Sequence, residues 1–463
     1  MESTTYTAVM ERREAILERS LGIDYSALER GGGWFDYEAL MDLVGLDLDG
    51  IRQVQRDSGV GQTPLIELHN VTELVRREAG PGKGARIFVK DEAANPSGSF
   101  KDRRASLSAY YASRAGYAGM VAATSGNYGA GVAAQAARYG LRAIVIQEAF
   151  DSHGRGQPEI LEKGRKCEAL GAEVIQTTVG PELFYLLLRV LEETGYFNAS
   201  LYTPFSIRGI ETLGAEIAED TRALCGREPD VVLATHAGGG MVTGTARGLR
   251  AVGAEHTQMI GVSVDLAGLH MASDRDFNRK SFTTGHTGFS IPFTSWPDRV
   301  DVPRNSARPL RHLDRFVLVS QGEVFFATEL LGRAEGLERG PAGNTSLAAA
   351  IPLAAELDRD QVLVISETEY TGAGKAPTSQ LAFAAEMGVQ VRNGARNENQ
   401  PGQVISIPLS VEELGVTEVD LDRLRRSYLK KAPMVEGAGA PEAHAFFAED
   451  LGFGVENLSE LGA

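Results

Sequence analysis

The sequence is poor in cysteine, in basic charge and in long apolar runs, and each shortage excludes a class of protein. Its 463 residues include two cysteines, Cys167 and Cys225, too few for a disulfide scaffold or a cysteine-rich metal site. The formal net charge is −16, whereas nucleic acid and anionic membranes bind basic patches. No segment has the roughly 20 apolar residues of a membrane-spanning helix. We expect a cytoplasmic protein with small-molecule or protein partners.

From residue 86 onward, short runs rich in Val and Ile alternate with Ala-rich helical segments, and turns that contain Gly separate them. This alternation is typical of an α/β protein. Because the strand runs are almost continuously apolar, they indicate mainly parallel sheets covered by helices. The pattern predicts strands over 86–90, 119–123, 141–147, 173–177, 230–235, 258–264, 316–320 and 361–366, and helices over 100–114, 128–139, 181–194 and 346–357.

The two ends of the chain have a different pattern from its middle. Residues 1–60 are helical and polar, and their first 21 residues are charged and amphipathic, unlike a signal peptide. We interpret residues 1–60 as an N-terminal extension. Residues 392–403 are polar and contain Gly, Asn and Pro, which is typical of a linker or long loop at the start of a C-terminal region over 392–463.

Four segments contain residues that could take part in catalysis or ligand binding. The first, 95–104, follows the strand predicted to end at residue 90. A turn rich in Asn, Pro, Ser and Gly opens a helix, and Lys101 stands in the first helical turn. The positive field at a helix N-terminus favours the neutral form of a lysine and hence a nucleophilic amine. An ordinary surface lysine is the alternative interpretation.

The second segment consists of Thr124, Ser125, Gly126, Asn127 and Tyr128, again between a strand and a helix. Small hydroxyl residues and exposed backbone N–H groups at a helix start form an anion site that suits a carboxylate. The alternative is that Ser125 or Asn127 is merely a helix N-cap.

The third segment places Gly238, Gly239, Gly240 and Met241 directly after the strand at 230–235. Three consecutive glycines let backbone N–H groups surround a phosphate, and the following helix dipole adds attraction. The spacing is neither that of a dinucleotide fingerprint nor that of a nucleoside triphosphate loop. A flexible turn is the alternative.

The fourth segment, 366–375, follows the strand predicted over 361–366 and presents hydroxyls and carboxylates, among them Ser366, Glu367 and Thr371. Ligands of open α/β sheets bind beyond the carboxyl ends of the strands. The four segments can therefore converge on one crevice.

Taken together, the segments resemble the tryptophan synthase beta-like family, the fold type II pyridoxal phosphate enzymes, in family order over about 61–375. Residues 95–103 are similar to the cofactor-lysine motif, which implies that Lys101 is catalytic and carries pyridoxal 5'-phosphate. Residues 124–127 resemble the substrate-carboxylate loop, with Asn127 at the phenolic oxygen of the cofactor, and 238–244 resemble the phosphate loop. A further segment, 335–343, is similar to one before the final core strand.

The resemblance leaves the partner of the cofactor's pyridine nitrogen open. Residues 371–375 resemble the segment that supplies a threonine there in threonine synthase, which makes Thr371 the first candidate. Counting from the end of the strand points instead to Ser366 or Glu367. Two residues depart from the family pattern: Arg104 stands where many members have a small residue, and Met241 where Thr or Asn is common.

The resemblance implies two domains and a particular kind of enzyme. A large cofactor domain would span 61–94 and 207–391, and a small mobile domain, 95–206, would close over the substrate. Residues 87–95, 180–185, 281–289 and 367–375 are similar to family members that act on an amino acid together with coenzyme A or acetyl-CoA. This implies an acyltransferase, the catalytic subunit of a pair with a small alpha subunit, around a homodimeric core. The alternative is β or γ replacement or elimination on an amino acid, as in threonine synthase or a dehydratase.

Overall fold

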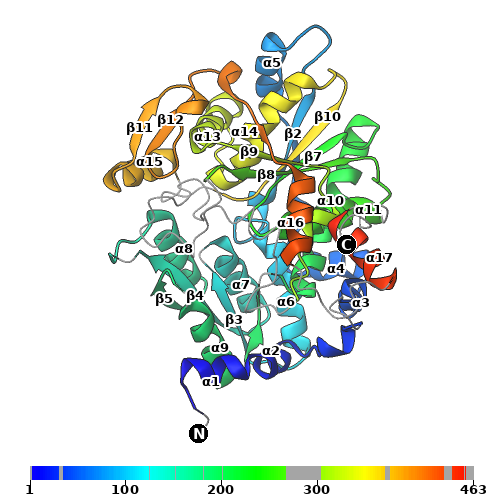
Figure 1. Cartoon of the computed structure of the whole chain (residues 1–463), viewed down its shortest axis with the longest axis vertical. Helices are drawn as coiled ribbons and strands as arrows, with labels where there is room; N and C mark the ends of the chain where they lie inside the picture. Colours follow the sequence, from blue (N-terminus) through cyan, green and yellow to red (C-terminus); the bar gives the residue numbers. More distant parts are fainter. Residues whose placement is uncertain are drawn as a thin grey trace.

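Two largely parallel sheets organise the chain (Figure 1). The computed structural model describes residues 3–30, 35–124, 126–151, 153–180, 182–200, 202–266, 304–370, 376–431, 441–452 and 454. The larger sheet has the strand order β1 (Leu65–Glu67), β2 (Arg86–Asp91), β10 (Val362–Glu367), β7 (Val231–Thr235), β8 (Gln258–Val264), β9 (Arg315–Val319) and β13 (Thr417–Glu418). The smaller sheet has the order β5 (Glu173–Thr178), β4 (Arg142–Phe150), β3 (Gly119–Thr124) and β6 (Phe197–Asn198).

The predicted fold class is confirmed. Strands β1 and β13 are antiparallel to their neighbours at the edges of the larger sheet, and the central strands of both sheets run parallel. Every strand and helix predicted from residue 86 onward is present. The largest difference is at α14 (Pro341–Glu356), which begins five residues before the predicted 346 because Pro341 occupies its first turn.

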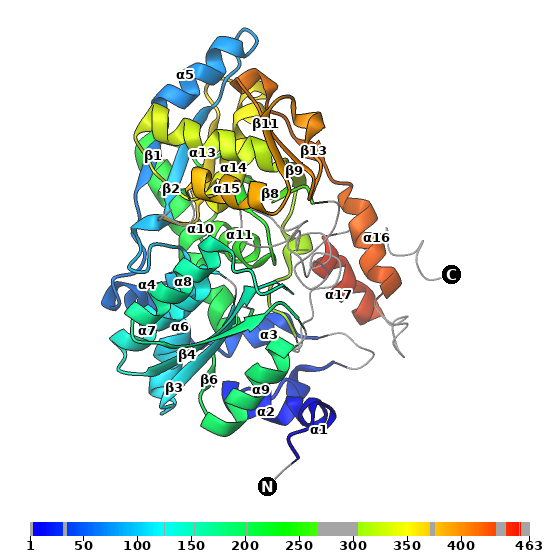
Figure 2. The same cartoon turned by 90° about the vertical axis from the view of Figure 1, so that its left-hand side faces the viewer.

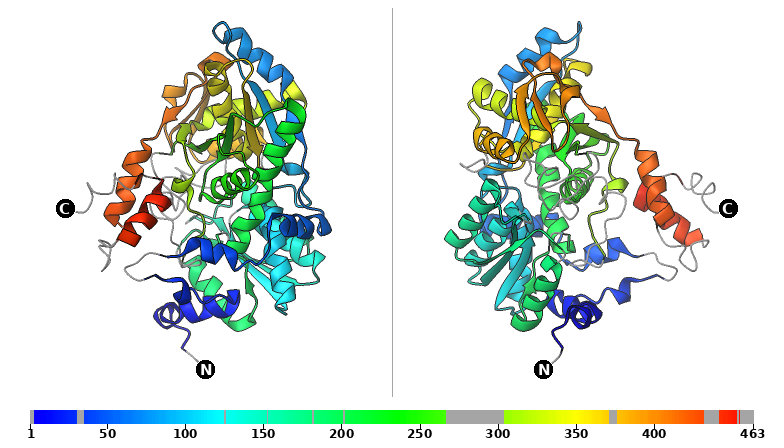
Figure 3. Two further views of the ribbon diagram at one scale, coloured as in Figure 1. Left: turned by 90° about the vertical axis from the view of Figure 1, so that its right-hand side faces the viewer. Right: turned by 60° about the vertical axis from the view of Figure 1, so that its left-hand side comes forward.

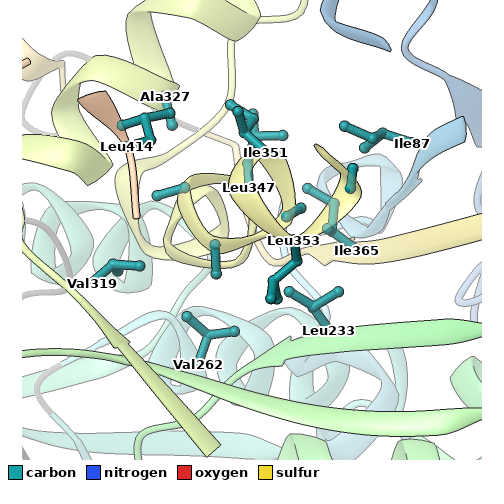
Figure 4. Packing of buried hydrophobic residues seen from close by; sticks show 14 of the residues in the cluster. Ile87, Leu233, Val262, Val319, Ala327, Leu347, Ile351, Leu353, Ile365 and Leu414 are labelled. Atoms are coloured by element: carbon teal, nitrogen blue, oxygen red, sulfur yellow. The ribbon is translucent and has the colours of Figure 1, made fainter. Parts of the chain in front are cut away.

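Helices cover both faces of the larger sheet, as its apolar strands require. On one face α5 (His69–Glu78), α13 (Gln321–Glu335) and α14 pack on alternate strand residues such as Ile87, Leu233 and Ile365, and Figure 4 shows these residues around α14. On the other face α10 (Pro204–Cys225) and α11 (Gly240–Ala251) pack on the intervening residues, including Phe88 and Val364. The core therefore has a layer on each side of the sheet.

The smaller sheet is covered in the same way. Helices α6 (Lys101–Arg114), α7 (Asn127–Arg138) and α8 (Pro158–Ala169) lie on the face that includes Met120 and Ala122. Helix α9 (Glu182–Thr194) covers the opposite face, where Val121 and Ile146 are buried. Helices α6 and α10 pack against each other and join the two sheets.

The first 60 residues are helical, as predicted, but they contribute to the core and do not simply extend from it. Helices α1 (Tyr6–Glu11) and α2 (Arg13–Leu21) pack against α9, as Figure 2 shows. Helices α3 (Tyr37–Asp42) and α4 (Leu48–Asp57), with the short turn η1 (Ser26–Leu28), add apolar residues to the cluster around α6 and α7.

The C-terminal part returns to the larger sheet. After α15 (Pro377–Glu386), strands β11 (Gln390–Asn393) and β12 (Val404–Ile407) form a parallel pair, and the stretch predicted as a linker connects them through η6 (Arg396–Glu398). Helices α16 (Leu421–Lys431) and α17 (Pro441–Leu451) lie on one flank of the molecule (Figure 3). In the part of the chain that the structure describes, every helix is too short or too polar to cross a membrane. The limits of the two domains stay a prediction.

Candidate active site

The turn that leads into α6 is fixed by hydrogen bonds from backbone N–H groups to its side chains. Asn95 Oδ1 accepts the backbone N–H of Gly61 at 3.0 Å, and Asp102 Oδ2 accepts that of Ser97 at 2.7 Å. Lys101 is the first residue of α6 and is half-buried, with Nζ 4.1 Å from the centre of the Phe100 ring. The amine thus lies beside the Phe100 ring near the start of α6.

Asp102 and Arg103, which follow Lys101, serve the scaffold. Burial raises the pKa of Asp102 to about 6, and its other oxygen accepts Nε2 of Gln135 at 2.9 Å. Arg103 Nε donates to Glu92 at 2.7 Å, and Arg103 Nη2 donates to Glu216 at 2.8 Å. The three side chains are largely buried. This ion-pair network ties α6 to the end of β2 and to α10, which fixes the helix that carries Lys101.

The second segment lies against the first. Thr124 Oγ1 accepts the backbone N–H of Gly126 at 2.9 Å, Asn127 is the first residue of α7, and Tyr128 is buried. A Cβ on Gly131 would lie 3.1 Å from the carbonyl carbon of Lys101. The start of α6 is therefore in contact with the N-terminal half of α7, as a shared site requires. Ser125 lies outside the described residues.

The third segment forms a loop in which each glycine is needed for a different steric reason. A Cβ on Gly238 would lie 1.6 Å from Oη of Tyr202, and one on Gly240 would lie 2.0 Å from Nη2 of Arg104. Gly239 has φ +83° and caps α11. The side chains of Tyr202, Arg104 and Pro309 thus pack closely on the loop, and the first N–H groups of α11 lack acceptors within the helix, as at the helix starts that bind anions.

Met241 does not disturb this loop. Its side chain is buried in the apolar cluster beneath α11 with Ile210 and Leu249. The departure from the family pattern at Met241 therefore places its side chain in the core and leaves the glycine loop unobstructed by it.

The fourth segment joins the first through backbone hydrogen bonds. Phe100 N–H donates to the carbonyl of Thr368 at 3.1 Å, and Tyr370 N–H donates to that of Gly98 at 2.8 Å. Ser366 and Glu367 end β10 and are fully buried. Thr371 lies outside the described residues.

Glu367 is the most unusual acid of the site. Neither carboxyl oxygen has a hydrogen-bond partner among the described residues, and a Cβ on Gly343 would lie 1.8 Å from Oε1. Burial, and then the charges of Glu369 and Asp91, raise its pKa well above the usual value. The carboxyl group therefore keeps its proton to a higher pH than an exposed glutamate does and can donate a hydrogen bond.

The raised pKa of Glu367 makes stability depend on pH. The folded chain binds this proton more tightly than the unfolded chain, whose glutamate ionises near 4.5, so the folded state loses relative stability as the pH rises above that value. Glu367→Gln imitates the protonated form. We expect its apoprotein to gain melting temperature relative to wild type at about pH 8, and to gain less at about pH 5. Thermal unfolding measures both, and exposed Glu386→Gln is the control. An equal gain at the two pH values would contradict the raised pKa.

The structure adds residues that the sequence motifs did not identify as part of the site. Tyr202 contacts the glycine loop from outside all four segments, and no sequence signal points to it. Arg104 reaches the same loop, and its spacing of three residues from Lys101 on one helix could have indicated this. His236, between β7 and the loop, is buried, which lowers its pKa to about 4, so its imidazole is neutral at neutral pH.

Comparisons with known proteins agree with this geometry. The sequence model of a family described as "Pyridoxal-phosphate dependent enzyme" matches residues 57–367. The chain is 60% identical over 431 residues, 93% of this chain and 91% of the relative, to a 2-amino-4-ketopentanoate thiolase beta subunit from an unknown prokaryotic organism. It is 57% identical over 428 residues, 92% and 91% of the two chains, to the protein of that name from Acetoanaerobium sticklandii.

A solved structure supports the fold. The crystal structure of cysteine synthase from Entamoeba histolytica superposes with a TM-score of 0.54 at 23% identity, over 68% of this chain and 86% of that chain. At this identity the similarity concerns the architecture of the chain.

Proposed function

The chain belongs to the pyridoxal-phosphate dependent enzyme family, and from this premise we propose that it catalyses the thiolysis of 2-amino-4-oxopentanoate by coenzyme A. The products are acetyl-CoA and alanine, and the reaction can also run in reverse. The observation that carries the proposal is the high identity to two thiolase beta subunits over almost the whole chain. The fold and the gathered segments are what this chemistry requires.

The residues of the site fit pyridoxal 5'-phosphate. In this proposal the backbone N–H groups of Gly238, Gly239 and Gly240, together with the backbone of Met241, bind its phosphate at the start of α11. In this proposal Lys101 provides the amine that holds its aldehyde carbon, and Asn127, at the start of α7, donates from its amide to the phenolic oxygen. When bound, the cofactor withdraws electrons from the α-carbon of an amino acid and so makes the α-proton easier to remove.

The pyridine nitrogen has three candidate partners, one of which is Ser366 at the end of β10. Thr371 is the first, because of its family segment, and Glu367 is the alternative because its buried carboxyl group lacks a hydrogen-bond partner among the described residues. Measurement of α-proton exchange of alanine in Thr371→Val and Glu367→Gln separates them, because only the variant that loses the partner slows the exchange.

Each remaining residue has a defined task. Lys101 in its neutral form accepts the α-proton, and Thr124, Ser125, Gly126 and Tyr128 bind the substrate carboxylate at the start of α7. The small domain closes over the substrate and excludes water. In the net reaction the C3–C4 bond breaks, the acetyl group forms a bond to the coenzyme A sulfur, and C3 receives the proton that the thiol loses.

The proposal includes a partner. The relatives are named beta subunits, so we expect a small alpha subunit to join this catalytic chain, with a homodimeric core of catalytic chains. Two cysteines in 463 residues and a net charge of −16 agree with a cytoplasmic location.

The proposed function predicts a substrate preference. The chain, reconstituted with its alpha subunit, should form acetyl-CoA from 2-amino-4-oxopentanoate and coenzyme A, measured by chromatography of the thioester together with alanine. We expect no comparable turnover of O-phosphohomoserine or serine. A faster release of phosphate or pyruvate from those substrates would favour the threonine synthase-like or dehydratase-like alternative. The Lys101→Ala chain with the same alpha subunit corrects for background thioester formation.

A further inference from the structure

Arg104 lies in the candidate active site on the same helix face as Lys101. It stands three residues later in α6, so the two side chains extend from adjacent turns. Arg104 is 2% exposed. Its guanidinium carbon lies 5.2 Å from the ring centre of Tyr202 and 5.9 Å from that of Tyr128. The aromatic rings thus hold the cation in place between α6, α7 and the glycine loop.

The guanidinium reaches the start of α11. A Cβ on Gly240 would lie 2.0 Å from Nη2 of Arg104, so the arginine packs directly on the first residue of that helix. A Cβ on Gly238 would collide with Tyr202, which also contacts Arg104. Arg104 and Tyr202 therefore form one wall of the cradle whose floor is the glycine backbone.

This arrangement brings positive charge to a place that is already positive. The first N–H groups of a helix lack acceptors within the helix and carry about half a positive charge. An anion bound at this helix start would therefore be within reach of both the backbone N–H groups and the guanidinium. A phosphate monoester carries about −1.5 to −2 charges near neutral pH, and the guanidinium can donate two parallel hydrogen bonds to its oxygens.

We propose that Arg104 is a ligand of the cofactor phosphate and that it acts with the backbone of Gly238, Gly239 and Gly240. The inference rests on the proposed position of the phosphate at the glycine loop. It assigns a function to the residue that departs from the family pattern, because a small residue at this position cannot reach the loop. Charge compensation in this chain thus comes from a side chain as well as from the helix dipole.

The test compares two forms of the cofactor that differ only in the phosphate. Apoprotein of the full chain is titrated with pyridoxal 5'-phosphate and with pyridoxal, and binding is followed by visible absorbance. We expect Arg104→Met to weaken binding of pyridoxal 5'-phosphate by about ten- to a hundredfold, because a charged hydrogen bond is lost. Binding of pyridoxal should change by less than about threefold. Arg114→Met, at an exposed position of the same helix, is the matched control.

Further outcomes separate this inference from its alternatives. Unchanged affinity of Arg104→Met for pyridoxal 5'-phosphate, or an equal loss for pyridoxal, overturns the inference. Unchanged cofactor affinity with a raised KM for the amino acid would assign Arg104 to the substrate carboxylate instead. If Arg104→Met does not fold, Arg104→Lys gives the same comparison, because a shorter point charge loses the paired hydrogen bonds. Failure of the glycine-loop assignment itself is detected separately by Gly239→Asp.

Discussion

Replacing Lys101 by alanine should lower kcat by at least about a thousandfold, because in the proposed mechanism this side chain both holds the cofactor and accepts the α-proton. The cofactor should still bind through its phosphate, since the glycine loop is unchanged. Borohydride treatment followed by mass spectrometry of peptides measures the covalent link directly. In wild type the label should be on the peptide that contains Lys101, and in the variant it should be absent.

A matched control makes this result specific. Lys83→Ala removes an exposed lysine that pairs with Asp358, and it should keep both the reducible link and the turnover. A Lys101→Ala protein that retained a cofactor linked to another lysine would show that the catalytic lysine lies elsewhere.

Gly239→Asp should raise the dissociation constant of pyridoxal 5'-phosphate by at least about a hundredfold. Gly239 has φ +83°, a backbone angle that residues with a side chain rarely adopt. A Cβ at this position would lie 2.6 Å from Cγ of Pro309. The loop must therefore shift, and the new carboxylate adds negative charge beside a phosphate dianion. Titration of apoprotein with the cofactor measures the loss.

Two variants separate charge, strain and folding in this result. Gly239→Ala has the same steric conflict without the charge, so it should weaken binding less. Gly253→Asp places the same residue at φ +78° just beyond the other end of α11, where nothing lies within 4 Å, and it should bind the cofactor normally. Unchanged cofactor content in Gly239→Asp would remove the loop from the phosphate site.

The fold was predictable where elements are long and buried on both sides. Strand β10, for example, has Leu363 and Ile365 on one face and Val362 and Val364 on the other, so its apolar run is continuous in the sequence. The short strands β6 and β13 have two residues each, too few to form a pattern. Strands β11 and β12 have four residues each, and the polar stretch between them predicts only a linker.

The candidate site was predictable to the extent that it follows strand ends. Lys101, Asn127 and the glycine loop all start helices after strands, and this local pattern is readable from the chain alone. The contacts of Arg104 with Gly240 and Tyr202 depend on how α6 packs against α10 and α11. The burial of Glu367, which raises its pKa, depends likewise on the position of Gly343. Such packing has no local sequence signal.

The position of β10 has a consequence for how the protein is synthesised. This strand pairs with β2 on one side and with β7 on the other, yet in the chain it comes after every other strand of the larger sheet except β13. A nascent chain on the ribosome that has not reached residue 362 therefore has two fragments of the larger sheet, each with an unpaired central edge. Open edges invite pairing with other chains. The smaller sheet, whose strands lie within 119–198, can assemble earlier. We therefore expect newly made chains to be prone to aggregation through the larger sheet until β10 emerges.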